Sequence, residues 1–292
     1  QDYVFGIVLC ALFFAFTLGS HGENGRSFLT DLRQADFSSI GSALLGGIIF
    51  NASNILLSAA IAVCGMSVAF PVGVGLALVL GVIINYIGEA KGNPIFIFIG
   101  VFLITIAIIL NGIAYKKASV DNKKVSVKGL TLAISAGFIM AFFYRFVAAS
   151  IDLTSFEHPA AGKMTPYTAV FIFSLGILTS NFLFNTIAMK HPVEGKAIPI
   201  SGYFKGRAIT HLVGLLGGII WCVGQSFSMI ASEKAGAAIS YGLGQGATLV
   251  SALWGILIWK EFKGATPICR ILNMCMFILF LIGLYCLIYA GA

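Results

Sequence analysis

LLGGIIF at residues 44–50 returns as LLGGIIW at residues 215–221, an offset of 171 residues. The same register continues without a gap, so that Gly65 matches Gly236, Phe70 matches Tyr241, and Leu78-Val79 matches Leu249-Val250. Slipped by one residue, EAKG at 89–92 matches EFKG at 261–264. Because the match covers two apolar stretches, a turn and a loop, we interpret it as an internal duplication rather than a chance similarity between apolar runs.

The composition places the duplicated chain in a membrane. Of the 292 residues, 59% are hydrophobic and 10% are charged, and 34 are glycine. Soluble domains have roughly 45–50% apolar and about 25% charged residues, so a soluble protein could not cover its surface with so few charges. The net charge of +7 is not clustered in a basic aromatic patch, which excludes a nucleic-acid-binding class. Disordered and collagen-like classes are excluded as well.

Stretches without charged residues give the number of spanning helices, because a helix needs about 20 mostly apolar residues to cross a bilayer. We therefore predict an all-α polytopic membrane protein with nine transmembrane helices in this chain. The predicted spans are 3–20, 40–63, 67–88, 94–115, 129–150, 166–189, 208–232, 236–259 and 268–290.

The distribution of Lys and Arg predicts the topology. With nine spans, 12 of the 18 basic residues lie on the side that holds the loops 116–128, 190–207 and 260–267, and 5 lie on the other side. The richer side is predicted to be cytoplasmic. On this topology the two LLGGII segments cross the membrane in opposite directions. An inverted repeat is typical of secondary transporters, whose substrate site lies between the halves near the middle of the membrane.

The repeat also predicts the domain organisation. Residues 1–115 form a first repeat with four helices, 116–128 form a cytoplasmic connecting loop, and 129–292 form a second repeat with five helices. The counterpart of 129–150 is missing from the first repeat. We therefore expect another helix before Gln1, which would complete a ten-helix bundle of five plus five.

Three motifs carry a resemblance to a known family: GAAISYGLGQG at 236–246, ALWG at 252–255 and WKEFKG at 259–264. The chain resembles the drug/metabolite transporter superfamily, and within it the glucose/ribose porter group of bacterial sugar-uptake proteins and the related plant ureide permeases. The resemblance implies two inverted halves of five helices, proton symport and a location in the cytoplasmic (inner) membrane of a bacterium. It also implies that the first helix is lacking here.

One departure bears on the choice within that family. Ureide permeases are described with a Walker-A-like sequence in their central loop, whereas 116–128 has no Gly-rich run. Neither Gly162-Lys163 nor Gly195-Lys196 has the spacing of a phosphate-binding loop. ATP binding is not supported, no cofactor is expected, and the resemblance favours the sugar porters.

Polar side chains share one face on each of four predicted spans, because residues three, four or seven apart lie on the same side of a helix. The four stripes are Asn51, Asn54 and Ser58; Trp221, Gln225 and Ser228; Tyr241, Gln245 and Thr248; and Ser174, Asn181 and Asn185. Neutral hydrogen-bonding groups beside aromatic rings suit a neutral hydroxylated solute. For any single residue, a hydrogen bond between helices is the alternative.

Arg145, within the span 129–150, is a candidate for the substrate path together with Tyr144, since ionisable residues inside a membrane are costly. The alternative is that its long side chain reaches the headgroups near the outer end of the helix, towards Asp152 or Glu157. The candidate substrate-binding residues are thus Asn51, Asn54, Tyr144, Arg145, Asn181, Asn185, Trp221, Gln225, Tyr241, Gln245 and Thr248.

Other chemistry finds little support. All eleven carboxylates lie in loops or at helix ends. Proton coupling would therefore need a group in the missing helix, or Asp152, Glu157 or His211. Facilitated transport of the solute without protons is the alternative. His211 is otherwise a capping or packing residue. The six cysteines have no metal-ligand spacing. No catalytic motif such as H-E-x-x-H or G-x-S-x-G occurs, so neither an enzyme nor a metal site is predicted.

These observations predict a secondary transporter that moves a small neutral polar solute by alternating access. Its partners are that solute, the lipid bilayer and, by resemblance, protons, and no nucleic acid. A sugar such as glucose is the favoured solute. The alternatives are a ureide or nucleobase permease and a multidrug permease. The residue pattern leaves the oligomeric state open.

Overall fold

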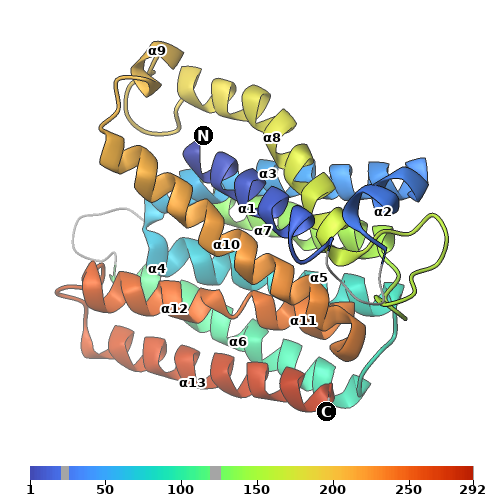
Figure 1. Cartoon of the computed structure of the whole chain (residues 1–292). Helices are drawn as coiled ribbons and strands as arrows, with labels where there is room; N and C mark the ends of the chain where they lie inside the picture. Colours follow the sequence, from blue (N-terminus) through green and yellow to red (C-terminus); the bar gives the residue numbers. More distant parts are fainter. Residues whose placement is uncertain (21–25, 119–125, 292) are drawn as a thin grey trace. The chain divides into compact units, whose positions relative to one another are not determined.

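The computed structural model describes residues 1–20, 26–118 and 126–291, and it is built of helices, as the predicted all-α membrane fold requires (Figure 1). Within these residues, eight helical segments are long and apolar enough to cross a membrane. The remaining predicted span, 3–20, is a helix of 15 residues. The elements are α1 (Asp2–Phe16), α2 (Phe28–Gln34), α3 (Phe37–Cys64), α4 (Met66–Ala69), η1 (Phe70–Val74), α5 (Gly75–Gly88), α6 (Pro94–Ala118), α7 (Val127–Ser150), α8 (Pro166–Lys190), α9 (Ile200–Tyr203), α10 (Ala208–Ala235), α11 (Ala237–Gly244), α12 (Ala247–Leu253), η2 (Trp254–Ile258) and α13 (Pro267–Ala290).

Glycines end helices at positions that correspond in the two halves of the sequence. Gly65 separates α3 from α4 with φ of 84°, and its counterpart Gly236 separates α10 from α11 with φ of 83°. The loop glycines of the EAKG and EFKG motifs, Gly92 and Gly264, also have positive φ, at 93° and 86°. A side chain is strained at such angles, so glycine is needed there. The sequence duplication is therefore accompanied by the same local backbone conformations.

The chain forms two compact units, and neither is continuous in sequence. Unit 1 comprises residues 1–52 and 142–237, and unit 2 comprises 53–141 and 238–292. The helices α3 and α7 pass from one unit to the other. Each unit thus contains helices from both predicted repeats. The division into two repeats at 115 and 129 concerns ancestry, and it stays a prediction. Residues 119–125 of the predicted connecting loop lie outside the described residues.

In unit 1, α1 lies along α10 (Figure 1). Glycines allow the two backbones to touch. A Cβ atom added to Gly6 would lie 2.1 Å from the Leu215 carbonyl oxygen, and one added to Gly218 would lie 1.9 Å from that of Tyr3. Helices approach this closely only where small residues face each other.

A second glycine crossing in unit 1 joins α3 and α8. A Cβ atom on Gly47 would lie 2.1 Å from the Phe173 carbonyl oxygen, and one on Gly176 would lie 2.1 Å from that of Leu44. Gly47 is the counterpart of Gly218 in the repeat, so the two crossings use corresponding residues.

Contacts between α3 and α7 show that these helices are antiparallel in unit 1. The Ser42 hydroxyl donates to the Phe146 carbonyl at 2.7 Å, and eight residues further along α3 the ring of Phe50 lies 5.1 Å from that of Phe143. Moving forward along α3 therefore moves the contact backward along α7.

Contacts between α7 and α10 show that these two helices run the same way. The Tyr144 hydroxyl donates to the Ser228 carbonyl at 3.1 Å, and beyond the end of α7 the Phe156 amide donates to Glu233 Oε1 at 2.8 Å. Since α7 opposes α3, the part of α3 in unit 1 opposes α10. The segments 44–50 and 215–221 thus run in opposite directions, as the predicted inverted repeat requires.

In unit 2, α6 and α13 lie side by side (Figure 1). They approach at another glycine pair, where a Cβ atom on Gly283 would lie 2.9 Å from the Gly100 carbonyl oxygen. The predicted span 67–88 is not one regular helix. It contains the π-helical turn η1 around Pro71, because proline supplies no amide hydrogen to a regular helix.

Glu261 holds the start of that interrupted span within unit 2. Its carboxylate accepts the amides of Met66 and Ser67 at 2.9 and 2.8 Å, and it also accepts the Ser67 hydroxyl. A carboxylate is favourable at a helix N-terminus because the first amides have no partner in the helix. Glu261 belongs to the repeated EFKG motif, so this motif has a structural role.

Candidate functional site

An aromatic cluster occupies the middle of unit 1 and contains the predicted site residue Trp221. The half-buried Trp221 ring stacks on Phe50, with centroids 4.4 Å apart and planes inclined by 30°. Phe173 lies on it at 6.1 Å and 22°, and Phe143 meets Phe50 edge-on. The four rings come from α3, α7, α8 and α10. Phe50, Phe143 and Phe173 are buried, so Trp221 is the one ring of the four that is partly exposed and could stack on a flat molecule.

Gln225 lies one helical turn beyond Trp221 on α10. Its Nε2 atom is buried and has no hydrogen-bond partner among the described residues. Leaving such a donor unpaired costs about 1–3 kcal/mol, so buried amides normally have a partner. Among the predicted residues of unit 1, Gln225 is thus the one whose buried side-chain amide is available to donate a hydrogen bond to a solute.

The predicted asparagines of unit 1 divide into two kinds. Asn51 is buried and donates to the Ser180 hydroxyl at 3.0 Å, which joins α3 to α8. Asn51 thus forms a hydrogen bond between helices, which is the alternative to substrate contact for each polar residue of the four stripes. Asn181 is buried and Asn185 is half-buried, and neither side chain has a hydrogen bond to a described residue.

Arg145 and Tyr144 are neighbours on α7 but differ in their bonding. The Tyr144 side chain is buried, and its hydroxyl bonds to α10. Arg145 is half-buried and forms no ion pair with any residue that the structure describes. The expected partner Asp152 instead accepts the Thr154 hydroxyl at 2.6 Å and the Ala160 amide at 2.9 Å. The guanidinium group is thus not neutralised by either suggested carboxylate.

The loop 151–165 also determines the acidity of Asp152. Burial alone would raise its pKa, but the hydrogen bonds from Thr154 and Ala160 stabilise the charged form and hold the pKa below its usual range. Asp152 is therefore a poor carrier of protons near neutral pH, although it was considered for proton coupling.

His211 lies at a different end of unit 1. Its Nδ1 atom is 2.9 Å from Asp2 Oδ2, and the Tyr203 hydroxyl donates to the same carboxylate. Burial and the hydrogen bond to Asp2 raise the pKa of Tyr203 to about 12. This contact joins α9 and α10 to the start of α1, which agrees with the packing role considered for His211.

In unit 2, three predicted residues lie where the span 236–259 is interrupted. Tyr241 is buried in α11, and its hydroxyl donates to the Ala77 carbonyl at 3.1 Å while its ring covers Gly81. Its packing role is therefore clear. The helix then breaks between α11 and α12, and half-buried Gln245 lies in this break.

Thr248 follows the break at the start of α12. It is buried, and its hydroxyl has no hydrogen-bond partner among the described residues. Broken helices with free polar groups are a recurrent feature of binding sites in secondary transporters. Asn54, also in unit 2, is half-buried and has no side-chain hydrogen bond to a described residue, while its carbonyl accepts the Ser58 hydroxyl.

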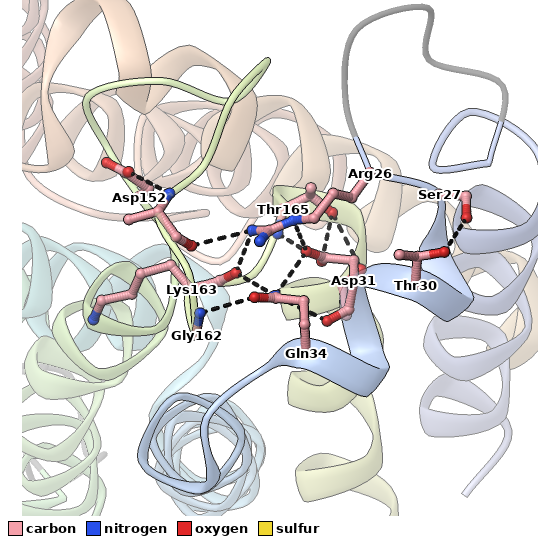
Figure 2. A network of polar contacts seen from close by, with 11 residues as sticks. Arg26, Ser27, Thr30, Asp31, Gln34, Asp152, Gly162, Lys163 and Thr165 are labelled. Carbon is pink, nitrogen blue, oxygen red and sulfur yellow. Dashed lines mark hydrogen bonds and ion pairs between the residues drawn. The ribbon is translucent and has the colours of Figure 1, made fainter.

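The largest polar network in unit 1 lies around α2, which was not predicted (Figure 2). Asp31 is fully buried, and its Oδ1 atom lies 3.1 Å from Arg26 Nε. Its Oδ2 atom accepts the Thr165 amide at 2.8 Å and the Thr165 hydroxyl at 3.0 Å. Asp31 thus joins α2 to the start of α8.

Gln34 continues the same network (Figure 2). Its Oε1 atom accepts the Gly162 amide, and its Nε2 atom donates to the Lys163 carbonyl, both at 2.8 Å. Arg26 donates to the same carbonyl. The loop before α8 is thereby held by three side chains of one short segment. The helix α2 could have been predicted from the apolar residues Phe28 and Leu32, which are four residues apart and so share one face of a helix.

Comparison with known proteins gives consistent relatives. The family model described as Ureide permease matches residues 1–128 and 123–290. Ureide permease 1 of Arabidopsis thaliana is 24% identical over 342 residues, covering 97% of this chain and 86% of its own length. Ureide permease 2 of the same plant is 24% identical, covering 96% and 86%. Probable ureide permease A3 of Vigna unguiculata is 23% identical, covering 90% and 86%.

Proposed function

The chain belongs to the ureide permease family, and from this premise we propose that it carries ureides across a membrane by alternating access. It is an integral membrane protein and a permease for small polar solutes. A ureide such as allantoin is a neutral molecule, and its urea groups present N–H donors and C=O acceptors in a plane. Such a solute needs side chains that can complete its hydrogen bonds and a flat apolar surface beside them.

The expectation of a sugar finds no support among the relatives, which are named ureide permeases. The ureide alternative therefore replaces it. The lack of a Gly-rich run in 116–128 had favoured the sugar porters, but this feature did not identify the solute. The relatives named above are plant proteins, so a bacterial inner membrane is not supported either.

The observation that carries the proposal is the pairing of Gln225 with Trp221 on one face of α10. The amide nitrogen of Gln225 is buried without a partner, and Trp221 belongs to the stacked aromatic cluster. A ureide carbonyl can accept the free amide hydrogen while the planar urea group lies on the ring. An unpaired buried donor needs an explanation, and we propose that the solute is its partner here.

Unit 2 supports the proposal independently through the break between α11 and α12. Gln245 in the break and the unpartnered hydroxyl of Thr248 offer further neutral groups. Neither is charged, which suits a neutral solute. Asn54, Asn181 and Asn185 remain candidates on the same reasoning. The side chains of Asn51, Tyr144 and Tyr241 already form hydrogen bonds to other helices, so the proposal does not rest on them.

The proposed mechanism rests on the inverted repeat. Two copies that cross the membrane in opposite directions can exchange conformations, which opens a shared site to either side in turn. The opposed segments 44–50 and 215–221 and the corresponding glycine crossings support this mechanism.

Uptake by the full-length protein in proteoliposomes tests the solute. We expect saturable uptake of radiolabelled allantoin, a ureide, that unlabelled uracil inhibits weakly and glucose does not inhibit. Glucose uptake without allantoin uptake would restore the sugar hypothesis. Absence of allantoin uptake by protein that melts cooperatively would refute the proposal.

Replacing Gln225 by leucine separates binding from stability. Loss of the hydrogen bond should raise the KM for allantoin by about tenfold to a hundredfold, the equivalent of about 1–3 kcal/mol. The Tm should not fall, because the variant removes an unsatisfied buried group. Tracer uptake and thermal melting measure the two effects. Thr179→Val on α8, whose exposed hydroxyl bonds only within its helix, is the control and should change neither. An unchanged KM would count against Gln225 as a binding residue.

Arg145 is tested by paired variants. A guanidinium group can donate two parallel hydrogen bonds to carbonyl oxygens, which an ammonium group cannot reproduce. Arg145→Lys and Arg145→Gln should therefore both lower kcat/KM by about tenfold or more, as loss of a charged hydrogen bond does. Full uptake by Arg145→Lys would show that the residue only reaches the headgroups. Exposed Arg33→Gln serves as the control.

A further inference from the structure

A pocket of about 450 Å³ lies within unit 2, beside the segment 259–266 that joins η2 to α13. One part of its wall is apolar and includes Leu257, Met274 and Phe277. The other part carries Lys260, Lys263 and Arg270. Three cations beside an apolar wall fit a molecule with an anionic group and a hydrocarbon part.

Among the residues that the structure describes, no carboxylate forms an ion pair with the cations of this pocket. None of the three forms an ion pair with a described residue, and all three are exposed. The neighbouring Glu261 is occupied, because its oxygens accept the amides at the start of α4. The positive charge of the pocket is therefore available to a ligand.

A buried amide adds a directed donor to the pocket. Asn273 lines the pocket and is only 6% exposed. Its Oδ1 atom accepts Asn111, while its Nδ2 atom donates to no described residue. Arg270 lies in the first turn of α13, where the free amides of the helix also favour an anion.

The position of the pocket indicates where its ligand comes from. The segment 259–266 links two membrane spans and so lies at a membrane surface. Trp254, the first residue of η2, and Trp259, which follows η2, are 51% and 53% exposed. Exposed tryptophans gather at the headgroup level of bilayers. Leu257 and Met274, at 63% and 60% exposure, are open to the hydrocarbon.

We propose that this pocket binds the anionic headgroup of a membrane phospholipid, with an acyl chain against Leu257 and Met274. The lipid phosphate forms ion pairs with Lys263 and Arg270, and the Asn273 side-chain amide donates a hydrogen bond to a headgroup oxygen. Basic pockets between transmembrane helices on the anionic leaflet bind lipids in this way. None of the residues proposed for ureide binding lines this pocket.

Quenching of tryptophan fluorescence by brominated lipids tests the proposal. The full-length protein with Trp221→Phe is reconstituted in phosphatidylcholine vesicles with increasing brominated phosphatidylglycerol. Among the tryptophans of this chain, Trp254 and Trp259 then remain, and they report the relative binding constant of the two lipids. We expect the parent protein to bind the anionic lipid in preference to phosphatidylcholine. The double variant Lys263→Gln/Arg270→Gln should lower the relative binding constant by about thirtyfold, or about fivefold for each cation removed.

The matched control is Lys116→Gln/Lys117→Gln, which removes two exposed cations at the end of α6, outside the pocket. It should change the preference by less than about twofold, as surface charges do. Equal effects of the two double variants would overturn a specific site. The proposal would also be overturned if Lys263→Gln/Arg270→Gln kept the lipid preference of the parent protein while its Tm in phosphatidylcholine equalled that of the parent.

A second measurement distinguishes lipid from a soluble anion. Phosphatidylglycerol should raise the Tm of the parent protein and not that of Lys263→Gln/Arg270→Gln. Inorganic phosphate at the same concentration should leave both unchanged. A rise with inorganic phosphate equal to that with lipid would overturn the assignment to lipid.

Discussion

Gly218→Ala is expected to prevent the stable packing of α1 against α10. The added methyl group would lie 1.9 Å from the Tyr3 carbonyl oxygen and 2.9 Å from the Ile7 amide nitrogen, which belong to the backbone of α1. Backbone atoms cannot rotate away as a side chain can, so the helices must separate. Overpacking costs about 1–3 kcal/mol even where side chains can adjust, and we expect at least the upper end here.

Thermal unfolding of purified protein and the yield of monodisperse protein measure this effect. Gly224→Ala is a matched control on the same helix, because its Cβ atom would have no neighbour within 4 Å. This control should be neutral or slightly stabilising, since alanine favours helix by about 1 kcal/mol over glycine. Equal yields and melting temperatures for the two variants would contradict the close crossing.

The repeat predicts that Gly47→Ala should behave like Gly218→Ala. Its methyl group would lie 2.1 Å from the Phe173 carbonyl oxygen in the corresponding crossing of α3 and α8. Gly41→Ala on α3 is the parallel control, because that position has open space. A large effect at one crossing and none at the other would show that the two copies have diverged in packing.

Asp31→Ala is expected to destabilise unit 1 by about 3 kcal/mol, the lower end for breaking a buried ion pair. The lower end applies because the Arg26 side chain is 23% exposed and can regain water. The substitution also leaves the amide and hydroxyl of Thr165 without their acceptor. The loop before α8 should loosen, and trypsin should cut after Arg26 and Lys163 faster than in the parent protein.

A double-mutant cycle identifies the ion pair as the cause. Arg26→Ala/Asp31→Ala should lose less stability than the two single variants together, because each single variant leaves one partner of the pair without the other. Arg33→Gln on the exposed side of α2 is the control and should leave the Tm unchanged. Additive losses would indicate that Arg26 and Asp31 act separately.

The membrane-spanning helices could be predicted closely because a bilayer imposes a length and a composition on each span. The predicted 94–115 and 166–189 correspond to α6 and α8, which begin at the same residues. The interruptions were less predictable. The predicted span 236–259 is divided between α11 and α12, and the break lies beside Gly244 and Gly246.

The candidate site was predictable by residue type but not by role. Helical spacing places Asn51, Trp221, Gln225 and Thr248 on polar faces, yet spacing does not show which of them already have partners. Asn51 is bonded to Ser180, whereas Gln225 and Thr248 keep a free buried group. The network around Asp31 was missed because it joins α2 to Lys163 and Thr165, which lie 129 or more residues further along the sequence.

The amino-acid sequence by itself determined that this chain lies in a membrane, which segments are long and apolar enough to span it, and that one segment occurs twice. These properties depend on local composition and on the cost of exposing polar backbone to lipid. Tertiary structure alone decided which helices share a unit, which glycines touch backbone, and which polar groups are left unpaired. Those depend on contacts between residues far apart in the chain, because a hydrogen bond or a close crossing exists only when both partners are in place.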